Sequence, residues 1–155
     1  MSAITKRLQE LDIQLPTPAK PAAKYVPYVI TGNQVVISGQ IPFVNGSVEG
    51  QTGKLGADCD IEKGKKVARV CGINILAQLR EACGGNLDKV KRCVRLGVFV
   101  NSAPDFTEQP AVANGVSELI ADVFGERGQH ARSAFGVAAL PFGVAVEVEA
   151  TFEIA

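Results

Sequence analysis

Hydrophobic and polar residues alternate most regularly at the C-terminal end of the chain. Over residues 144–154, valine, phenylalanine and isoleucine occupy one set of alternate positions. Glu147, Glu149 and Glu153 lie in the other set. Because successive side chains of a strand point to opposite faces, this pattern predicts a strand with one buried face and one face that carries three carboxylates.

Other segments show the same period of two. Residues 25–30 and 34–40 flank a Gly-Asn turn and predict a β-hairpin. Residues 90–100 predict a long strand with Val94 on the buried side and Cys93 on the other, and residues 133–139 predict a further strand. Gly39 lies inside the second hairpin strand, where a glycine marks either a bulge or the close approach of a ligand or another backbone.

Helical spacing appears three times. Residues 4–11 predict a short amphipathic helix, and the proline-rich residues 15–21 after it predict an arm without regular structure. Apolar residues recur at helical spacing over 68–82, after a capping Asp58 or Asp60. A second stripe covers 112–123, and Asp105 with Glu108 resembles a capping arrangement before it.

The order of these elements predicts a two-layer α+β fold, a mostly antiparallel sheet with two helices packed on one face. We expect residues 1–24 to form an N-terminal helix and arm, and residues 25–155 to form the domain. The other face of the sheet carries apolar residues among its charges, so we expect a second subunit to cover it and the protein to be a homo-oligomer.

The composition of the chain argues against several classes of function. The chain has 155 residues, with 16 basic and 16 acidic side chains, and this balance argues against a dedicated nucleic-acid binder. No apolar run approaches the length of a membrane span, and the N-terminus lacks the apolar centre of a secretory signal. The four cysteines and single histidine do not have the spacing of a zinc site. We therefore expect a cytoplasmic protein with free thiols and no metal.

The segments that carry these features, taken in order, resemble the Rid family of reactive intermediate deaminases, also called YjgF-like proteins. The matching segments are Tyr25, Ile37-Ser38-Gly39-Gln40-Ile41-Pro42, Leu87-Asp88-Lys89-Val90, Val98-Phe99-Val100 with Asp105-Phe106, His130-Ala131-Arg132-Ser133, Leu140-Pro141 and Val146-Glu147-Val148-Glu149-Ala150. They extend from Tyr25 nearly to the C-terminus.

The resemblance implies a chorismate-mutase-like fold, a homotrimer with clefts between subunits, and hydrolysis of 2-imino or 2-enamino acids to 2-oxo acids and ammonia without a cofactor. Arg132 matches the arginine that holds the substrate carboxylate, and Glu147 matches the glutamate that positions the attacking water. The residues expected to line the cleft with them are Tyr25, Ser38, Gly39 and Ser133.

The chemistry of these side chains agrees with such roles, because a planar guanidinium grips a carboxylate through two parallel hydrogen bonds and a carboxylate can activate water. Two alternatives remain open from the residues alone. Arg132 can be a structural ion-pair partner of Glu147 or Glu149. His130 is expected to be a solvent-exposed loop residue, with a role as proton shuttle as the second interpretation.

The sequence also departs from the family pattern. Ala134 stands where many deaminating members carry a cysteine, and both residues 43–57 and the N-terminal arm are longer than in the archetypal members. Asn114 does not have the spacing of the family's helix asparagine, so no role is transferred to it. These departures keep two other functions open, a non-catalytic protein that binds small carboxylates and, with less support, an endoribonuclease.

Overall fold

A computed structural model gives the structure of residues 1–21 and 23–155. The helices are α1 (Ala3–Glu10), α2 (Ile61–Ala82) and α3 (Gln109–Phe124), and the strands are β1 (Tyr28–Thr31), β2 (Gln34–Gln40), β3 (Val90–Asn101), β4 (Ala131–Val137) and β5 (Val146–Ile154). Short 3-10 segments, η1 (Leu87–Lys89), η2 (Gly125–Gly128) and η3 (Pro141–Gly143), lie between them. No helix in this described part of the chain is long and apolar enough to cross a membrane.

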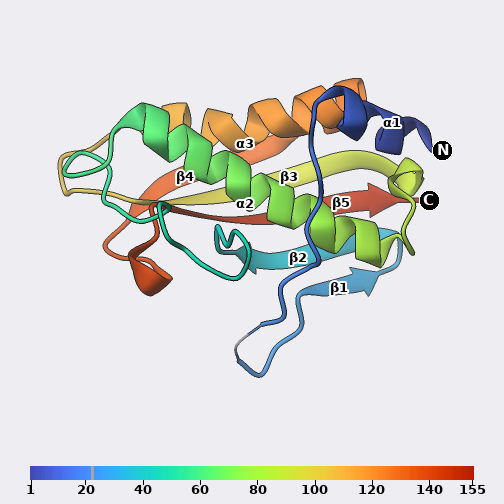
Figure 1. The fold of residues 1–155 in the computed structure, drawn as a ribbon, viewed down its shortest axis with the longest axis horizontal. Coiled ribbons are helices and arrows are strands. Elements are labelled where there is room, and N and C mark those ends of the chain that lie inside the picture. The colour runs from blue at the N-terminus through green and yellow to red at the C-terminus, as the bar shows by residue number, and fades with distance from the viewer. Residues whose placement is uncertain (22) are drawn as a thin grey trace.

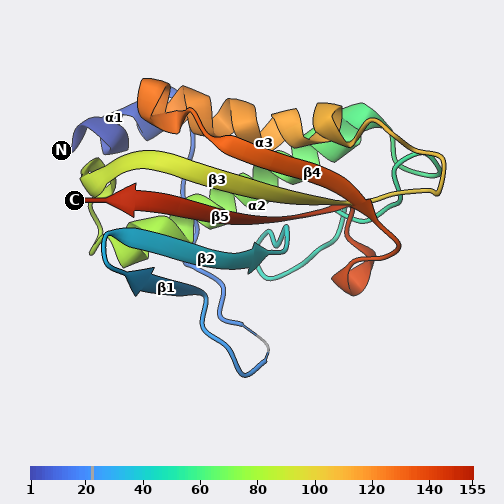
Figure 2. The same ribbon diagram turned by 180° about the vertical axis from the view of Figure 1, so that it is seen from behind.

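The strands form one sheet in the order β1-β2-β5-β3-β4. β3 and β4 are parallel, and every other pair is antiparallel. α2 and α3 lie side by side across one face of the sheet (Figure 1), and the view from behind shows the strands of the other face uncovered (Figure 2). The predicted two-layer α+β fold is therefore confirmed.

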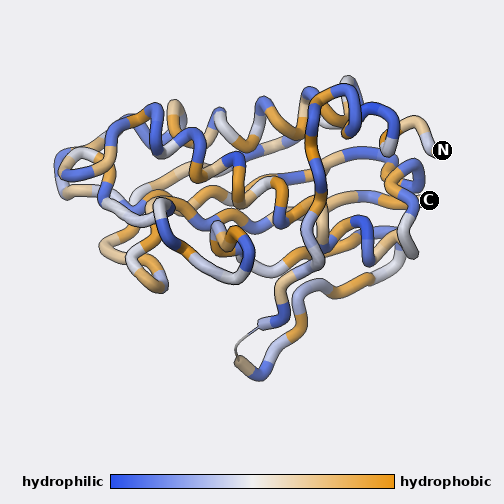
Figure 3. The backbone as a smooth tube through the Cα atoms, in the orientation of Figure 1, coloured by the Kyte–Doolittle hydropathy of each residue, from blue (hydrophilic) through white to orange (hydrophobic). Residues whose placement is uncertain are grey.

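The buried face of the sheet and the apolar stripes of the helices make one hydrophobic core, in which hydrophobic positions recur along each element (Figure 3). Val146, Val148 and Phe152 of β5 are fully buried, as the alternating pattern predicts. The stripe over residues 112–123 is buried against α2. All four cysteines are free and buried. Their thiols therefore serve as small apolar side chains of the core.

The capping prediction is correct at one helix and wrong at the other. Asp60 is the N-cap of α2, and its carboxylate accepts a hydrogen bond from the Lys63 N–H at 2.8 Å. At α3 the N-cap is Glu108, which makes no side-chain capping bond. Gln109 instead donates through Nε2 to the Phe106 carbonyl at 2.8 Å, and this hydrogen bond stabilises the turn that precedes α3.

The predicted faces of β3 are wrong near its start. The pairing with β5 shifts register between Val90 and Arg92 and again between Cys93 and Arg95. Each shift moves the following side chain to the other face. Cys93 is consequently fully buried in the core, and Val94 is only partly buried.

The N-terminal segment packs against the rest of the fold. The Asp88 carboxylate accepts hydrogen bonds from the Ala3 and Ile4 N–H groups at 3.1 and 2.9 Å, which fixes the start of α1. Ile4 lies in the same core as the sheet. The arm then crosses α2 (Figure 1), where the nearly fully buried Gln78 donates through Nε2 to the Ala19 carbonyl at 2.7 Å.

α2 and α3 are in close contact at Gly115. A Cβ atom at this position would overlap the Lys65 carbonyl of α2, because the carbonyl carbon lies only 2.8 Å from the place that it would occupy. A backbone group cannot rotate away as a side chain can, so only glycine allows this distance between the helices.

We expect Gly115→Ala to lower the free energy of unfolding by about 1–3 kcal/mol, the usual cost of overpacking a filled core. Urea denaturation followed by circular dichroism measures the change. Glu118→Gln, on the exposed side of the same helix, is the control and is expected to change the stability by less than about 0.5 kcal/mol. Equal stabilities of Gly115→Ala and the control would contradict this account of the crossing.

Candidate functional site

The uncovered face of the sheet holds a pocket of about 350 Å³. Its lining comes from the arm, the segment before β1, the end of β2, the η3 turn and β5. Of the residues expected at the site, Tyr25, Ser38, Gly39 and Glu147 lie here together. The structure therefore brings four of the six predicted site residues to one place.

A bulge in β2 builds the floor of this pocket. Ile37 pairs with Ala150 and Gln40 pairs with Val148, so three steps along β2 match two steps along β5. The bulge brings Gly39 against the Glu147 carboxylate, and a Cβ at Gly39 would overlap Glu147 Oε2. The bulge interpretation of this glycine is confirmed, and the group that approaches it closely is a side chain of β5 rather than another backbone.

The Glu147 carboxylate is half-buried in a partly apolar pocket. Burial raises its pKa above the ordinary value, and the negative charge of Glu149 raises it further. None of the described residues donates a hydrogen bond to this carboxylate. A carboxylate with a raised pKa and no protein partner is suited to accept a proton from water.

Ser38 and Tyr25 occupy different positions in the pocket wall. The Ser38 hydroxyl donates to the Val26 carbonyl at 2.7 Å, and its N–H donates to the Pro27 carbonyl at 2.9 Å. Ser38 thus holds the segment that carries Tyr25. Tyr25 is about half exposed (54%) and lines the pocket.

Arg132 lies on β4, at the edge of the sheet. Its Nη1 donates to Asn114 Oδ1 at 2.8 Å and to Ser117 Oγ at 3.2 Å, and both acceptors belong to α3. Nε and Nη2 of Arg132 have no hydrogen-bond partner among the described residues. The guanidinium therefore keeps one edge, the fork of Nε and Nη2, available to a ligand.

The structural ion pair considered for Arg132 is wrong for the described residues. No carboxylate lies within 4.0 Å of its guanidinium, and Glu149 pairs with Arg95 at 3.4 Å. Thus no carboxylate among residues 1–21 and 23–155 forms an ion pair with Arg132.

Arg132 and Glu147 do not share a pocket within one chain. Arg132 pairs in register with Leu96, and Glu147 pairs with Phe99. Positions 96 and 99 of β3 are three residues apart in a regular stretch, so the two side chains point to opposite faces of the sheet. Ser133 points to the same face as Glu147, away from the guanidinium.

Sequence reasoning missed the two partners of Arg132 and misplaced His130. Asn114 and Ser117 are three residues apart on α3 and so lie on one face of the helix. This polar pair beside an apolar stripe was the available signal. The prediction of a solvent-exposed His130 is wrong, because its ring is partly buried and both nitrogens are hydrogen-bonded, to Ser117 Oγ and the Gly128 carbonyl.

Known proteins are similar in sequence to this chain over almost its whole length. A family model described as "YjgF/chorismate mutase-like, putative endoribonuclease" matches residues 5–151. Protein TCP17 of Trypanosoma cruzi is 52% identical over 153 residues, which cover 97% of this chain and 94% of that protein.

Solved structures share the fold. The Agrobacterium tumefaciens protein Atu1372 is 45% identical and has a TM-score of 0.91, with 98% of this chain and 92% of that chain covered. Escherichia coli TdcF, solved with bound serine, is 27% identical with a TM-score of 0.60, over 90% of this chain and 94% of that chain. The segments that contain the expected site residues resemble those of Rid proteins. The family model and these similar proteins show that the chain belongs to the YjgF/chorismate-mutase-like family.

Proposed function

We propose that the protein hydrolyses reactive 2-imino and 2-enamino acids to 2-oxo acids and ammonia, in a cleft formed between subunits. One observation carries the proposal. Among the described residues, nothing binds the fork of Arg132 or donates a hydrogen bond to the Glu147 carboxylate, and the two side chains lie on opposite faces of the sheet, so that one site containing both requires a second copy. Two such groups of opposite charge are the minimum needed to hold an anionic substrate and activate water.

Arg132 supplies the substrate-binding half of this site. The fork of Nε and Nη2 matches the two oxygens of a carboxylate and fixes the orientation of the substrate, as a lysine ammonium cannot. The serine bound to TdcF supports an amino-acid-like ligand for a protein of this fold.

Glu147 supplies the water-activating half. Its carboxylate accepts a proton from water while the oxygen bonds to C2 of the imine, and Glu147 passes this proton to the nitrogen, which has received the carbon–nitrogen π pair. From the resulting carbinolamine, Glu147 takes the hydroxyl proton and gives it to the nitrogen as the carbon–nitrogen bond breaks, so that the oxygen forms the carbonyl of the 2-oxo acid and ammonia leaves. One imine and one water thus give one 2-oxo acid and one ammonia. Orientation of an already reactive substrate provides much of the remaining rate.

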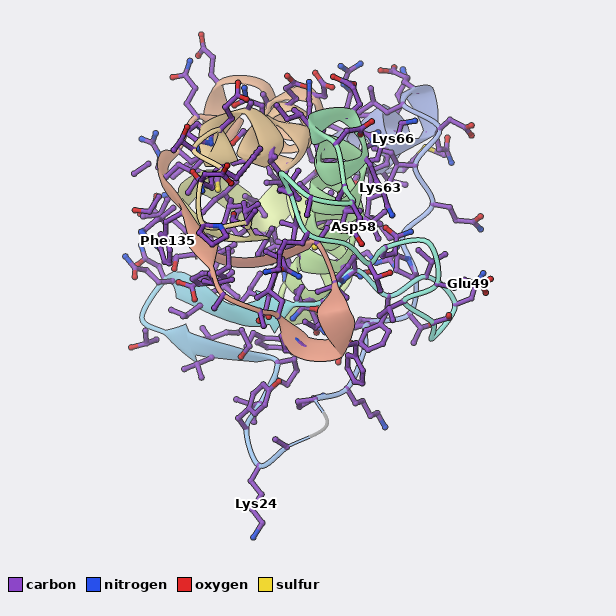
Figure 4. The ribbon with its side chains drawn as sticks, turned by 90° about the vertical axis from the view of Figure 1, so that its left-hand side faces the viewer. Lys24, Glu49, Asp58, Lys63, Lys66 and Phe135 are labelled. Atoms are coloured by element: carbon purple, nitrogen blue, oxygen red, sulfur yellow. The ribbon has the colours of Figure 1, made fainter. Side chains whose placement is uncertain are left out.

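The uncovered face of the sheet supports association with further copies. Val29 and Val36 are half exposed on this face of β1 and β2 (50% and 43%), and Phe135 of β4 is 47% exposed. Figure 4 shows Phe135 at the margin of the molecule, where β4 ends the sheet. Burying such residues favours an oligomer, and a closed homotrimer allows the Arg132 edge of one copy to meet the Glu147 pocket of the next.

Two alternatives belong to different classes of function. A non-catalytic protein that binds 2-oxo acids would use the Arg132 fork without needing Glu147. An endoribonuclease is the activity in the family description. The net charge of zero gives this chain little attraction for a polyanion, so we favour a small anionic substrate over RNA.

Arg132→Lys tests the substrate-binding role. We expect kcat/KM for 2-iminobutyrate, generated in a coupled assay and followed as its semicarbazone, to fall by about 10²-fold, because an ammonium cannot reproduce the bidentate grip. Arg7→Lys on α1 is the matched control and keeps wild-type activity. Wild-type activity in Arg132→Lys, or no acceleration by the unaltered protein, would refute the proposed function.

Mixed oligomers test whether the two halves come from different copies. Arg132→Ala and Glu147→Ala proteins are each expected to be inactive. Co-refolding them in equal amounts restores about a quarter of wild-type activity, since about one site in four then joins an intact Arg132 to an intact Glu147. If both groups acted within one chain, the mixture would stay inactive.

The raised pKa of Glu147 predicts a dependence of stability on pH. Above the raised pKa the folded protein carries a partly desolvated charge, whereas below 4.5, the ordinary value, both folded and unfolded states hold the proton. Glu147→Gln is therefore expected to raise Tm at pH 7.5, and the gain should vanish as the pH falls toward 4. The same variant loses about 10²–10⁴-fold in kcat. Scanning calorimetry across this pH range measures the effect, with Glu118→Gln as the surface control.

A further inference from the structure

We propose that Ser117 and His130 are positioning residues that hold the Arg132 guanidinium in the orientation in which it receives the substrate carboxylate. The proposal rests on the proposed function for its effect on turnover. The hydrogen-bond network itself is a property of the chain and can be measured without any substrate.

The network consists of four hydrogen bonds, two of which are made by the guanidinium. Arg132 Nη1 is 2.8 Å from Asn114 Oδ1 and 3.2 Å from Ser117 Oγ. Ser117 Oγ is 2.9 Å from His130 Nε2, and His130 Nδ1 is 2.6 Å from the Gly128 carbonyl. A continuous path therefore runs from the buried end of η2 to the arginine.

The chemistry of these groups fixes which atom donates and which accepts in each hydrogen bond of the path. A carbonyl oxygen only accepts, so His130 Nδ1 carries the proton and donates to Gly128. In the neutral ring Nε2 then has a free lone pair, and the Ser117 hydroxyl donates to it. The lone pairs of Ser117 Oγ are left to accept the Arg132 N–H. Each donor in the series has one acceptor, and His130 fixes which way the Ser117 hydroxyl points.

This arrangement decides which edge of Arg132 faces outward. Both N–H bonds of Nη1 are used by Asn114 and Ser117, so the guanidinium cannot rotate without losing two hydrogen bonds. The fork of Nε and Nη2 is thereby turned away from α3. Holding a long, flexible side chain in its binding orientation reduces the entropy lost when the ligand binds.

The local sequence explains how the network forms. His130 immediately precedes β4, and residues two apart in an extended chain share a face, so His130 and Arg132 both face α3. Asn114 and Ser117 lie three residues apart on the opposing helix. The spacing of two residues from His130 to Arg132 and the spacing of three residues on α3 therefore bring the four side chains of the network together.

The tautomer of His130 gives a test that requires no activity. The chain has one histidine, so protein labelled with 15N-histidine and free of any tag shows a single pair of imidazole nitrogens. At pH 8 we expect Nδ1 to be protonated and Nε2 to be the acceptor nitrogen, although imidazoles free in water favour the opposite tautomer. A spectrum with the proton on Nε2 would overturn the proposed direction of the network.

Substitution at Ser117 tests the effect on Arg132. We expect Ser117→Ala to broaden or shift the Arg132 Nε–H resonance and to raise KM for 2-iminobutyrate about tenfold, as for loss of a hydrogen bond to a charged group. The value of kcat is expected to change less than about twofold. Ser117→Thr, which keeps the hydroxyl, restores most of the affinity, and Glu118→Gln on the same helix changes neither quantity.

The outcomes separate this inference from the proposed function. A Ser117→Ala protein with lower Tm but unchanged KM and an unchanged Arg132 resonance would show that Ser117 is only structural and would overturn the inference. If the unaltered protein has no deaminase activity, the proposed function fails, and the tautomer and the Arg132 resonance still decide whether the network holds the guanidinium.

Discussion

The sheet has two faces and the chain supplies long helices for only one of them. This constraint explains the division of residues along β5, where buried valines and Phe152 alternate with glutamates. The covered face supplies the core that holds the fold together. The uncovered face supplies the Glu147 pocket, so the core and the candidate site use alternate residues of the same strand.

The position of β4 follows from the connection through α3. Parallel strands need a long crossover, and α3 provides it between β3 and β4. The last strand, β5, then enters between β2 and β3, which leaves β4 at the edge. Arg132 is thus placed on the one strand of the site that has a free side, beside the helix whose polar residues bind its guanidinium.

The periodicity of hydrophobic residues was sufficient to predict the helices and strands whose pattern is regular. The alternation over residues 144–154 and the apolar stripe of α3 predict strand and helix because burial follows the same period as the backbone. The prediction failed at Cys93 because a bulge changes the period by one residue without any marker in the sequence. His130 and Asn114 were misjudged for a different reason, since their roles depend on tertiary neighbours that are distant in the sequence.

The family resemblance predicted that Glu147 and Arg132 act as a pair, and the structure shows the contacts of each side chain separately. The resemblance did not predict on which faces of the sheet the two side chains lie relative to each other. Their placement on opposite faces depends on the register of three strands, which no local pattern encodes. Likewise, the contact between Gly39 and Glu147 depends on where the β2 bulge falls relative to β5.

The arm gives the pocket a wall that is independent of the sheet. Ala19, Lys20 and Pro21 line the cavity that contains Glu147, and Gln78 of α2 donates a side-chain hydrogen bond to the Ala19 carbonyl. That bond uses a backbone acceptor, so it tolerates changes of side chain along the arm. Figure 4 shows Lys24, just beyond, extending from the body of the protein. Substitutions along the arm can therefore change the size and charge of the pocket rim without changing the side chains that β2 and β5 contribute to the pocket.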